Sequence, residues 1–271
     1  MPLGAKTLLA GVVDLSARAW RDRPEPEACL RRALELQDLG ADLIDLSVIP
    51  LSGPLGRLDP DDEMRRLVPT LRKVRARVDV PVGVTTFHSQ TAERALGLEA
   101  AVILDPSGLA VDPRLGAVVN QTDAGLVLGH LPGGLESWNK PRPAVRLVET
   151  VAADLDSALA RARRAGIDRR RVVVDPGLGV GKRGQQDFEL LERLSELEQL
   201  GQPMLVTPSR KLFLTETVRA PEGDWNVGAA VVTALAVRGG AHIIRAVELA
   251  PVRAAARLAD RLLESFEAPR I

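Results

Sequence analysis

Cysteine is almost absent from this sequence, since Cys29 is the only one among 271 residues. A lone cysteine excludes an intramolecular disulfide and a cysteine-based zinc cluster. Net charge is also missing, because 36 Lys and Arg residues balance 36 Asp and Glu residues. No overall field attracts nucleic acid or an anionic membrane, so we expect neither partner and predict that charged ligands are bound by local groups.

Long apolar runs are missing as well. No stretch approaches the roughly 18 uninterrupted apolar residues that a membrane helix requires. The opening MPLGAKTLLAGVV leads directly into a repeating pattern and carries no cleavage site of a signal peptide. We therefore expect a cytoplasmic protein.

What the sequence does contain is a repeated alternation of short apolar runs with amphipathic segments. Continuous apolar runs are typical of parallel strands that helices cover on one side and a packed interior on the other. Eight such runs favour a single (β/α)8 TIM barrel over residues 1–271, and an open doubly wound sheet is less favoured because no Gly-x-Gly-x-x-Gly unit follows the first strand. The runs are residues 8–13, 42–48, 80–86, 100–105, 125–130, 171–177, 203–209 and 242–248.

Two of the segments between these runs have clear helical signals. Residues 144–166 place Val148, Val151, Leu155 and Leu159 on one stripe, and Gly166 follows as a helix terminator. The last helix is expected to begin at Pro251 and to close the outer ring of helices. Its predicted apolar side consists of Ala255, Leu258, Leu262 and Phe266.

Function in a β/α barrel lies at the C-terminal ends of the strands. Each predicted strand has a few polar residues at its C-terminal end. Two of the motifs that contain them are unusual. The residues are Asp14, Ser47, Thr85, Thr86, Asp105, His130, Asp175, Ser209, Arg210, Lys211, Arg245 and Glu248.

The first unusual group is DPGLGVGK, in which Asp175 ends a strand and glycines follow at alternate positions. Spaced glycines alone indicate only a tight turn. A carboxylate at this place can accept two parallel hydrogen bonds from the edge of a heterocycle, and Gly177 and Gly179 leave space for a flat ring.

The second group is TPSRKLF, where Ser209 precedes Arg210 and Lys211 at an expected helix start. In the simplest interpretation Ser209 is an N-cap and both cations are solvated. Cations in a first turn oppose the helix dipole, however, so their position favours a ligand that uses them.

With these motifs in place, the chain resembles the dihydropteroate synthase family along nearly its whole length. The shared motifs are GVV, ADLIDL, VILD, DPGLGVGK, PSRK and HIIR, in the order of the family. The resemblance implies a pterin-binding TIM barrel and a transferase of folate biosynthesis. Its reaction joins p-aminobenzoate to the methylene of a dihydropterin and releases pyrophosphate, with Mg²⁺ present.

The resemblance also implies roles for individual residues. Asp175 would bind the amino group and ring nitrogens of the pterin, and Lys211 would reach the pterin carbonyl and the second substrate. Ser209 would lie near the aminobenzoate carboxylate. Arg245 would lie against the pterin face and neutralise the leaving phosphate. The catalytic residues are thus Lys211 and Arg245, and the substrate contacts extend to Gly177, Gly179, Asp105 and Thr85.

Several positions depart from the family pattern. The first motif N-V-T-P-D-S-F is replaced from Asp14 onward, and the stretch Ile49–Gly53 lacks an anion-binding arginine. Thr85 replaces an aspartate that binds pterin, and Leu104 replaces an asparagine. Val247 replaces a histidine. Because each lost hydrogen bond costs roughly 1 to 3 kcal/mol, these changes predict a slower or altered reaction.

Compensation is possible in principle from cations elsewhere. Arg18, Arg21 and Arg23 surround Trp20, and Arg57 follows the second strand, so phosphate contacts could come from these loops, although such charge runs are usually only solvated. His130 could be a general base, although a lone histidine is more often structural. Asp14 is a weak candidate ligand for Mg²⁺.

Three functional hypotheses remain open. The first is a divergent pterin-binding transferase, the second is an enzyme that retains the parent reaction, and the third is a non-catalytic homologue that binds pterin or acts as a structural or regulatory subunit. The resemblance also implies a homodimer, and the alanine-rich segment Trp225–Arg238 is a plausible contact.

Overall fold

Short apolar segments form eight parallel strands in the computed structural model, which describes residues 6–16, 24–50, 55, 59–135, 138, 144–182, 184–208 and 224–267. Seven strands lie within runs that the sequence predicts to be strands, and β1 extends one residue beyond its predicted run, to Asp14. The strands are β1 (Leu8–Asp14), β2 (Leu43–Ser47), β3 (Val82–Thr85), β4 (Val102–Asp105), β5 (Gly125–Gly129), β6 (Val172–Asp175), β7 (Leu205–Val206) and β8 (Ile243–Ala246).

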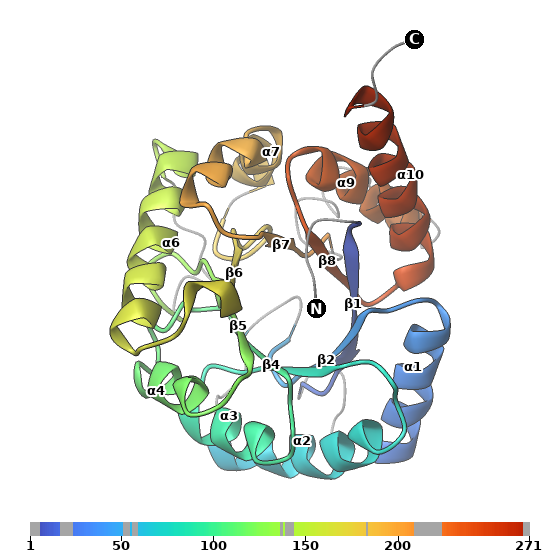
Figure 1. Ribbon diagram of the computed structural model, residues 1–271, viewed down its shortest axis with the longest axis vertical. Helices are drawn as coiled ribbons and strands as arrows, with labels where there is room; N and C mark the ends of the chain where they lie inside the picture. The colour runs from blue at the N-terminus through green and yellow to red at the C-terminus, as the bar shows by residue number, and fades with distance from the viewer. Residues whose placement is uncertain are drawn as a thin grey trace.

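The strands close into a barrel with helices around it (Figure 1). Hydrogen-bonded neighbours run in the order β6-β5-β4-β3-β2-β1-β8-β7. A parallel bridge between Val174 and Met204 joins the two ends of this order, and Val174 N donates to Pro203 O at 2.9 Å. The predicted (β/α)8 barrel is confirmed.

The outer ring is made of helices that follow the strands in the chain. In α6, Val148, Val151 and Leu155 are buried as predicted, and Gly166 follows the helix with φ of +86°, which a side chain would strain. The helices are α1 (Pro26–Asp38), α2 (Pro60–Arg75), α3 (Ser89–Leu96), α4 (Arg114–Asn120), α6 (Leu147–Arg164), α7 (Gly184–Glu192), α9 (Asp224–Arg238) and α10 (Leu249–Glu267), with 3-10 turns η1 (Arg169–Arg171) and η2 (Leu194–Leu200).

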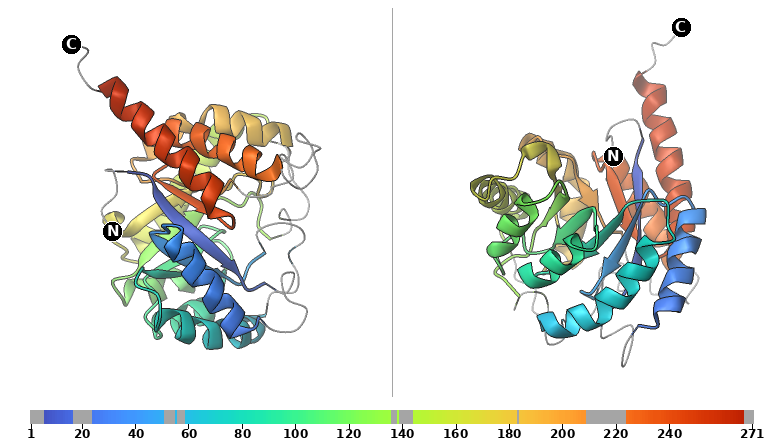
Figure 2. Two further views of the ribbon diagram at one scale, coloured as in Figure 1. Left: turned by 90° about the vertical axis from the view of Figure 1, so that its right-hand side faces the viewer. Right: turned by 60° about the horizontal axis from the view of Figure 1, so that its bottom comes forward.

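The last helix differs from the prediction, and its C-terminal end extends beyond the other elements (Figure 2). It begins at Leu249, with Pro251 in its first turn. The side predicted to pack on the barrel faces solvent, because Leu258 is 73% and Leu262 55% exposed. The buried face consists instead of Val252, Ala256 and Ala259, whose small side chains suit close packing of α10 against α9.

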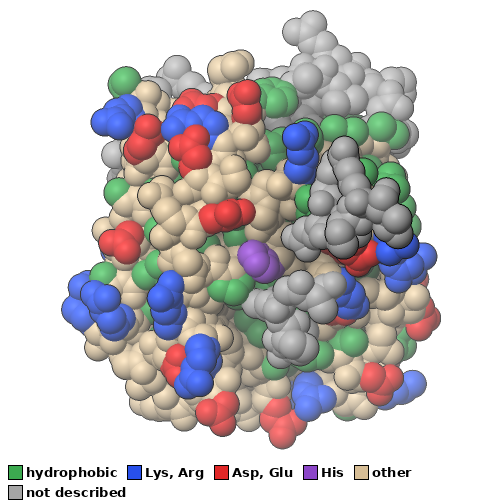
Figure 3. Space-filling view, turned by 45° about the horizontal axis from the view of Figure 1, so that its top comes forward, with side chains coloured by type: hydrophobic (Ala, Val, Ile, Leu, Met, Phe, Trp, Pro, Cys, Tyr) green, Lys and Arg blue, Asp and Glu red, His purple; other side chains and the backbone are tan. Residues whose placement is uncertain are grey.

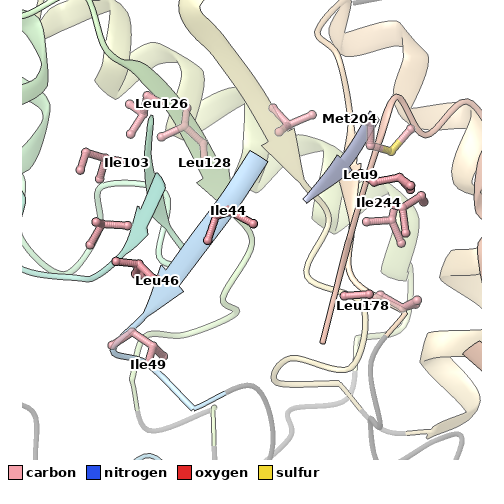
Figure 4. Close-up of a cluster of buried hydrophobic side chains, with 14 of the residues drawn as sticks. Leu9, Ile44, Leu46, Ile49, Ile103, Leu126, Leu128, Leu178, Met204 and Ile244 are labelled. Carbon is pink, nitrogen blue, oxygen red and sulfur yellow. The ribbon is translucent and has the colours of Figure 1, made fainter. Parts of the chain in front are cut away.

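Two apolar clusters fill the fold. The larger one lies between strands and helices, and Figure 4 shows part of it, including Leu9 and Ile44. The smaller one comes from alternate residues of the same strands, so it lies inside the barrel. Its members are Leu8, Ala10, Leu43, Leu104, Val127, Leu205 and Ile243.

This alternation decides which strand-end side chains point inward. Asp45, Asp175 and Arg245 each lie two residues after an interior position of their strands, so they point into the barrel mouth. Thr85 also points inward, because it alternates with Val82 and Val84, which belong to the larger cluster. Asp105 follows Leu104 directly and points toward the helices.

Charged side chains of both signs are interspersed on the face drawn in Figure 3, as expected from the balanced composition. Among the described residues, no helix has the length and apolar character that crossing a membrane requires.

Candidate functional site

A cavity opens at the C-terminal ends of the strands, where function was predicted. The structure brings four predicted site residues together in its wall, namely Thr85, Asp175, Gly177 and Arg245. Predicted Ser209 and Lys211 lie outside the described residues, as do Arg18, Trp20, Arg21, Arg23 and Arg57. The full lining consists of Ser47, Ile49, Pro50, Thr85, Pro106, Trp138, Asp175, Gly177, Leu178, Val180, Thr207 and Arg245.

Asp175 is held by the loop that follows it. Its Oδ1 accepts a hydrogen bond from Gly177 N at 2.8 Å. Gly177 has φ of +69°, and an added Cβ would lie 2.3 Å from His130 O, so only glycine fits there. Gly179 lies one position away from the cavity wall and donates its N–H to Asp187 Oδ1 at 2.6 Å. The predicted glycines therefore shape the loop that presents the carboxylate.

Lys182 holds the same loop from behind. Its side chain is 4% exposed, and Nζ donates to Gly177 O at 2.8 Å and to Val180 O at 3.1 Å. The same Nζ lies 3.1 Å from His130 Nδ1. An ammonium group can donate to several acceptors at once. Lys182, at the end of the DPGLGVGK motif, therefore forms an internal brace that ties this loop to His130.

His130 links this brace to α6. Its Nε2 lies 3.0 Å from Asp154 Oδ2, which indicates that Nε2 carries the proton and Nδ1 accepts from Lys182. Burial, followed by the positive charge of Lys182, lowers the pKa of His130 to about 4. The imidazole is therefore neutral at pH 7 and lies on the helix side of β5, where it positions Lys182.

Arg245 lies in a buried network across the barrel mouth. Its Nε donates to Asp45 Oδ2 at 2.7 Å, and Nη2 lies 2.5 Å from the same oxygen. Nη2 also donates to Thr85 Oγ1 at 3.1 Å. The Thr85 hydroxyl lies 2.9 Å from both oxygens of Asp45 and donates its single proton to this carboxylate. The charge of Arg245 is thus balanced inside the protein.

Sequence reasoning missed Asp45, which is fully buried. The available signal was one acidic residue in the middle of the apolar run 42–48, at an inward position two residues after Leu43. An acid at such a place requires a partner, and the partner is 200 residues away in β8.

The predicted contacts Asp105 and Asp14 lie outside the cavity wall. Asp105 accepts from Ser107 N at 2.8 Å, Ser107 Oγ at 2.7 Å and Leu109 N at 2.7 Å. Burial raises its pKa to about 6. Asp14 Oδ1 accepts from Ser16 N at 2.8 Å. Within the described part of the chain, no group of three or more His, Cys, Asp or Glu residues could hold a metal ion.

The cavity also contains an aromatic wall that the sequence did not suggest. Trp138 contacts Phe87 edge to face, with ring centroids 6.0 Å apart and an angle of 88° between the rings. Phe87 is completely buried just after β3, so it supports Trp138 from the core. Together with Ile49 and Leu178, the indole makes much of the wall apolar, as in sites for flat ligands.

Known proteins share both the sequence and this architecture. The family described as "Pterin binding enzyme" matches residues 20–246. The dihydropteroate synthase of Synechocystis sp. is 28% identical over 266 residues, which cover 96% of this chain and 91% of that protein. The enzyme of Mycobacterium leprae is 31% identical over 254 residues, with coverages of 89% and 88%.

Solved structures agree with these relatives. A dihydropteroate synthase from Clostridium difficile, crystallised in the presence of pteroic acid, has a TM-score of 0.89 and 27% identity, and the match covers 97% of this chain and 98% of that chain. The Xanthomonas albilineans enzyme in complex with 7,8-dihydropteroate has a TM-score of 0.83 and 26% identity, with coverages of 98% and 96%. The chain belongs to the pterin-binding enzyme family.

Proposed function

We propose that this protein is a transferase of the dihydropteroate synthase type that acts in folate biosynthesis. The amine nitrogen of p-aminobenzoate would attack the methylene carbon of a dihydropterin pyrophosphate. The C–O bond to pyrophosphate breaks, its electron pair leaves with the phosphate, and the amine loses a proton. The relatives are dihydropteroate synthases, and one was crystallised with pteroic acid.

One observation carries the proposal: Asp175 is an inward carboxylate in a cavity with largely apolar walls. Gly177 N holds one of its oxygens at 2.8 Å, which orients the group toward the mouth. Such a carboxylate suits the amino and N–H edge of a pterin, and Trp138, Leu178 and Pro106 supply surfaces for the flat ring.

Other roles follow from the resemblance. Lys211 and Arg245 are the proposed catalytic residues, and Ser209 the proposed contact of the aminobenzoate carboxylate. We propose Gly177, Gly179 and Thr85 as part of the binding region. Asp105 would act indirectly, because its oxygens are bonded to the β4–α4 loop.

We further propose that the reaction is slower than in a complete family site. The Thr85 hydroxyl is engaged with Asp45 and Arg245, and Leu104 belongs to the apolar cluster inside the barrel. Neither offers the ring a carboxylate or amide. Loss of two such contacts costs about 1 to 3 kcal/mol each.

The test is release of pyrophosphate from dihydropterin pyrophosphate and p-aminobenzoate, measured at high enzyme concentration. We expect slow release that depends on both substrates and that is about 10- to 100-fold slower in Asp175→Asn at low dihydropterin concentration. No release from the wild-type protein would contradict the transferase assignment.

A second candidate is a non-catalytic pterin-binding protein. The buried pair of Arg245 with Asp45 favours it, because this guanidinium is already neutralised and would attract a leaving phosphate less strongly. Calorimetry with pteroic acid separates the two candidates. Binding without pyrophosphate release would support the binding protein, and binding with release would support the enzyme.

Magnesium belongs to this proposal only as a companion of pyrophosphate. Asp14 is the proposed acidic ligand, but one of its oxygens accepts from Ser16 N. Magnesium would offset the charge of the leaving group when bound. If the metal is needed, EDTA should stop pyrophosphate release, and added Mg²⁺ should restore it.

We also propose a homodimer formed through the α9–α10 apolar surface. This surface comprises exposed side chains spaced four residues apart on two adjacent helices, namely Val227, Val231, Leu235, Leu258 and Leu262. Such a patch is typical of an interaction site, and the family resemblance suggests a second copy of the chain. Analytical ultracentrifugation should show a dimer that Val231→Glu converts to monomer, and a monomeric wild type would contradict this.

We propose that residues 1–271 form one domain in the cytoplasm. The strands and helices from β1 to α10 contribute to one barrel. Burial raises the pKa of the Cys29 thiol to about 11, so the thiol stays protonated at neutral pH. One cooperative unfolding transition and recovery in the cytoplasmic fraction would support these two points.

A further inference from the structure

Three residues with hydroxyl side chains line the described part of the cavity, and their hydroxyl groups differ in their partners. Ser47 Oγ donates to Ile49 O at 2.7 Å. Thr85 Oγ1 donates to Asp45 and accepts from Arg245. Thr207 is 4% exposed, yet its buried Oγ1 has no hydrogen-bond partner among the residues that the structure describes. The hydroxyl of Thr207 is therefore unsatisfied within this part of the fold.

The position of Thr207 directs its side chain toward the cavity. Thr207 follows β7 and lies two residues after Leu205, which belongs to the cluster inside the barrel. It therefore points inward. Its strand lies between β6, which ends in Asp175, and β8, which carries Arg245. All three side chains line the same cavity.

An unsatisfied buried hydroxyl weakens the folded state, because the group gives up water without gaining a protein partner. A valine of the same shape would avoid this loss. The retention of a hydroxyl in the ligand cavity is explained if a ligand completes its hydrogen bond.

We infer that Thr207 is a specificity-determining residue whose hydroxyl binds the ring carbonyl of the ligand. This inference rests on the proposed function, in which Asp175 binds the amino and N–H edge of a 2-amino-4-oxopyrimidine ring. In such a ring the carbonyl is the next group along the edge after the N–H. A hydroxyl on the strand beside Asp175 is suitably placed to donate to it.

The test compares Thr207→Val with wild type in two measurements. Calorimetry with pterin should show affinity about five- to tenfold weaker in the variant, as expected for one lost hydrogen bond. Thermal unfolding without ligand should show a melting temperature equal to that of wild type or higher. A hydroxyl with only a structural role would show the opposite pattern.

Two further variants serve as controls. Thr207→Ser keeps the hydroxyl and should keep the affinity of the wild type. Thr91→Val removes a buried hydroxyl of α3 that donates to Glu63 of α2 at 2.8 Å. This variant should lower the melting temperature and leave pterin affinity unchanged.

A pterin analogue without the 4-oxo group extends the test. Wild type and Thr207→Val should bind this analogue equally, because the proposed acceptor is gone. If wild type binds pterin and Thr207→Val binds it equally well, the inference about Thr207 is wrong and the proposed function stands. If wild type does not bind pterin, both the proposed function and the inference fail.

Discussion

Charged side chains have different partners in the two halves of the barrel mouth. On the β6 side, Asp175 accepts a hydrogen bond from Gly177 N, and Lys182 is buried behind the loop that follows β6. On the side of β2, β3 and β8, Asp45 and Arg245 neutralise each other with Thr85 between them. The cavity wall includes the Asp175 carboxylate, whereas the charges of Asp45 and Arg245 are paired with each other. A charged residue near a strand end can therefore serve the fold itself as well as a ligand.

The largest effect is expected from a variant that breaks the ion pair between Asp45 and Arg245. Asp45→Ala removes one partner of a buried ion pair and leaves Arg245 charged without compensation, so we expect a loss of about 3 to 5 kcal/mol in the free energy of unfolding. Urea denaturation measures this. The double variant Asp45→Ala with Arg245→Met should recover part of the loss, and a loss below about 1 kcal/mol in the single variant would contradict the paired network.

The next effect tests the brace behind Asp175 through its pH dependence. The pKa of His130 falls from 6.5 to about 4 on folding, so the unfolded chain binds the proton first as pH drops below 6.5. The contribution of His130 is therefore full above pH 6.5 and is lost between pH 6.5 and about 4, by about 3 kcal/mol in total.

Asp105 acts in the opposite direction over part of this range. Its pKa rises from 3.8 to about 6, so the folded protein binds the proton first and gains stability as pH falls from 6 toward 4. The stability difference between wild type and His130→Asn, measured by urea denaturation across this range, isolates the histidine. If the stability difference does not change with pH, His130 is not held neutral by the fold.

A smaller effect is expected for ligand binding on the β6 side. Asp175→Asn keeps the size of the side chain and removes its charge, which should weaken pterin binding by about 1.5 to 3 kcal/mol, or 10- to 100-fold. Calorimetry measures the affinity. Asp112→Asn, on the loop before α4, is the matched control and should bind like wild type. Equal binding by both variants would show that Asp175 does not hold the ring.

The smallest expected effect would make the two halves more alike. Thr85→Asp restores an acid at the end of β3 and offers the ring a second acceptor near Arg245. We expect pterin affinity to rise about three- to tenfold. Calorimetry is again the measurement, with Thr85→Asn as an uncharged control. Weaker binding in Thr85→Asp would show that a second carboxylate beside Asp45 is unfavourable at this position.

Much of the fold could be predicted from the sequence because strand signals are local. Apolar runs such as 42–48 and 171–177 gave the strands, and Gly166 marked the end of α6. The packing side of α10 could not be predicted in this way. Its sequence offers two apolar sides, and only packing in the folded barrel selects the one with Ala256 and Ala259.

The positions of some residues in the cavity wall could also be predicted from the sequence. Asp175 and Gly177 could be placed because both follow directly from one strand and its turn. Thr207 was inside a recognised motif, but nothing local indicates whether a hydroxyl has a partner. Ser209 and Lys211 remain predictions.

By itself the sequence determined the number of strands, their order along the chain and which residues stand at their C-terminal ends. Only the tertiary structure decided which partners these residues have. Arg245 meets Asp45 across 200 residues of chain, and Lys182 meets His130 across 52. Hydrophobic periodicity and turn residues are local signals that span only a few residues. Ion pairing and burial depend instead on which strands the closed barrel brings side by side.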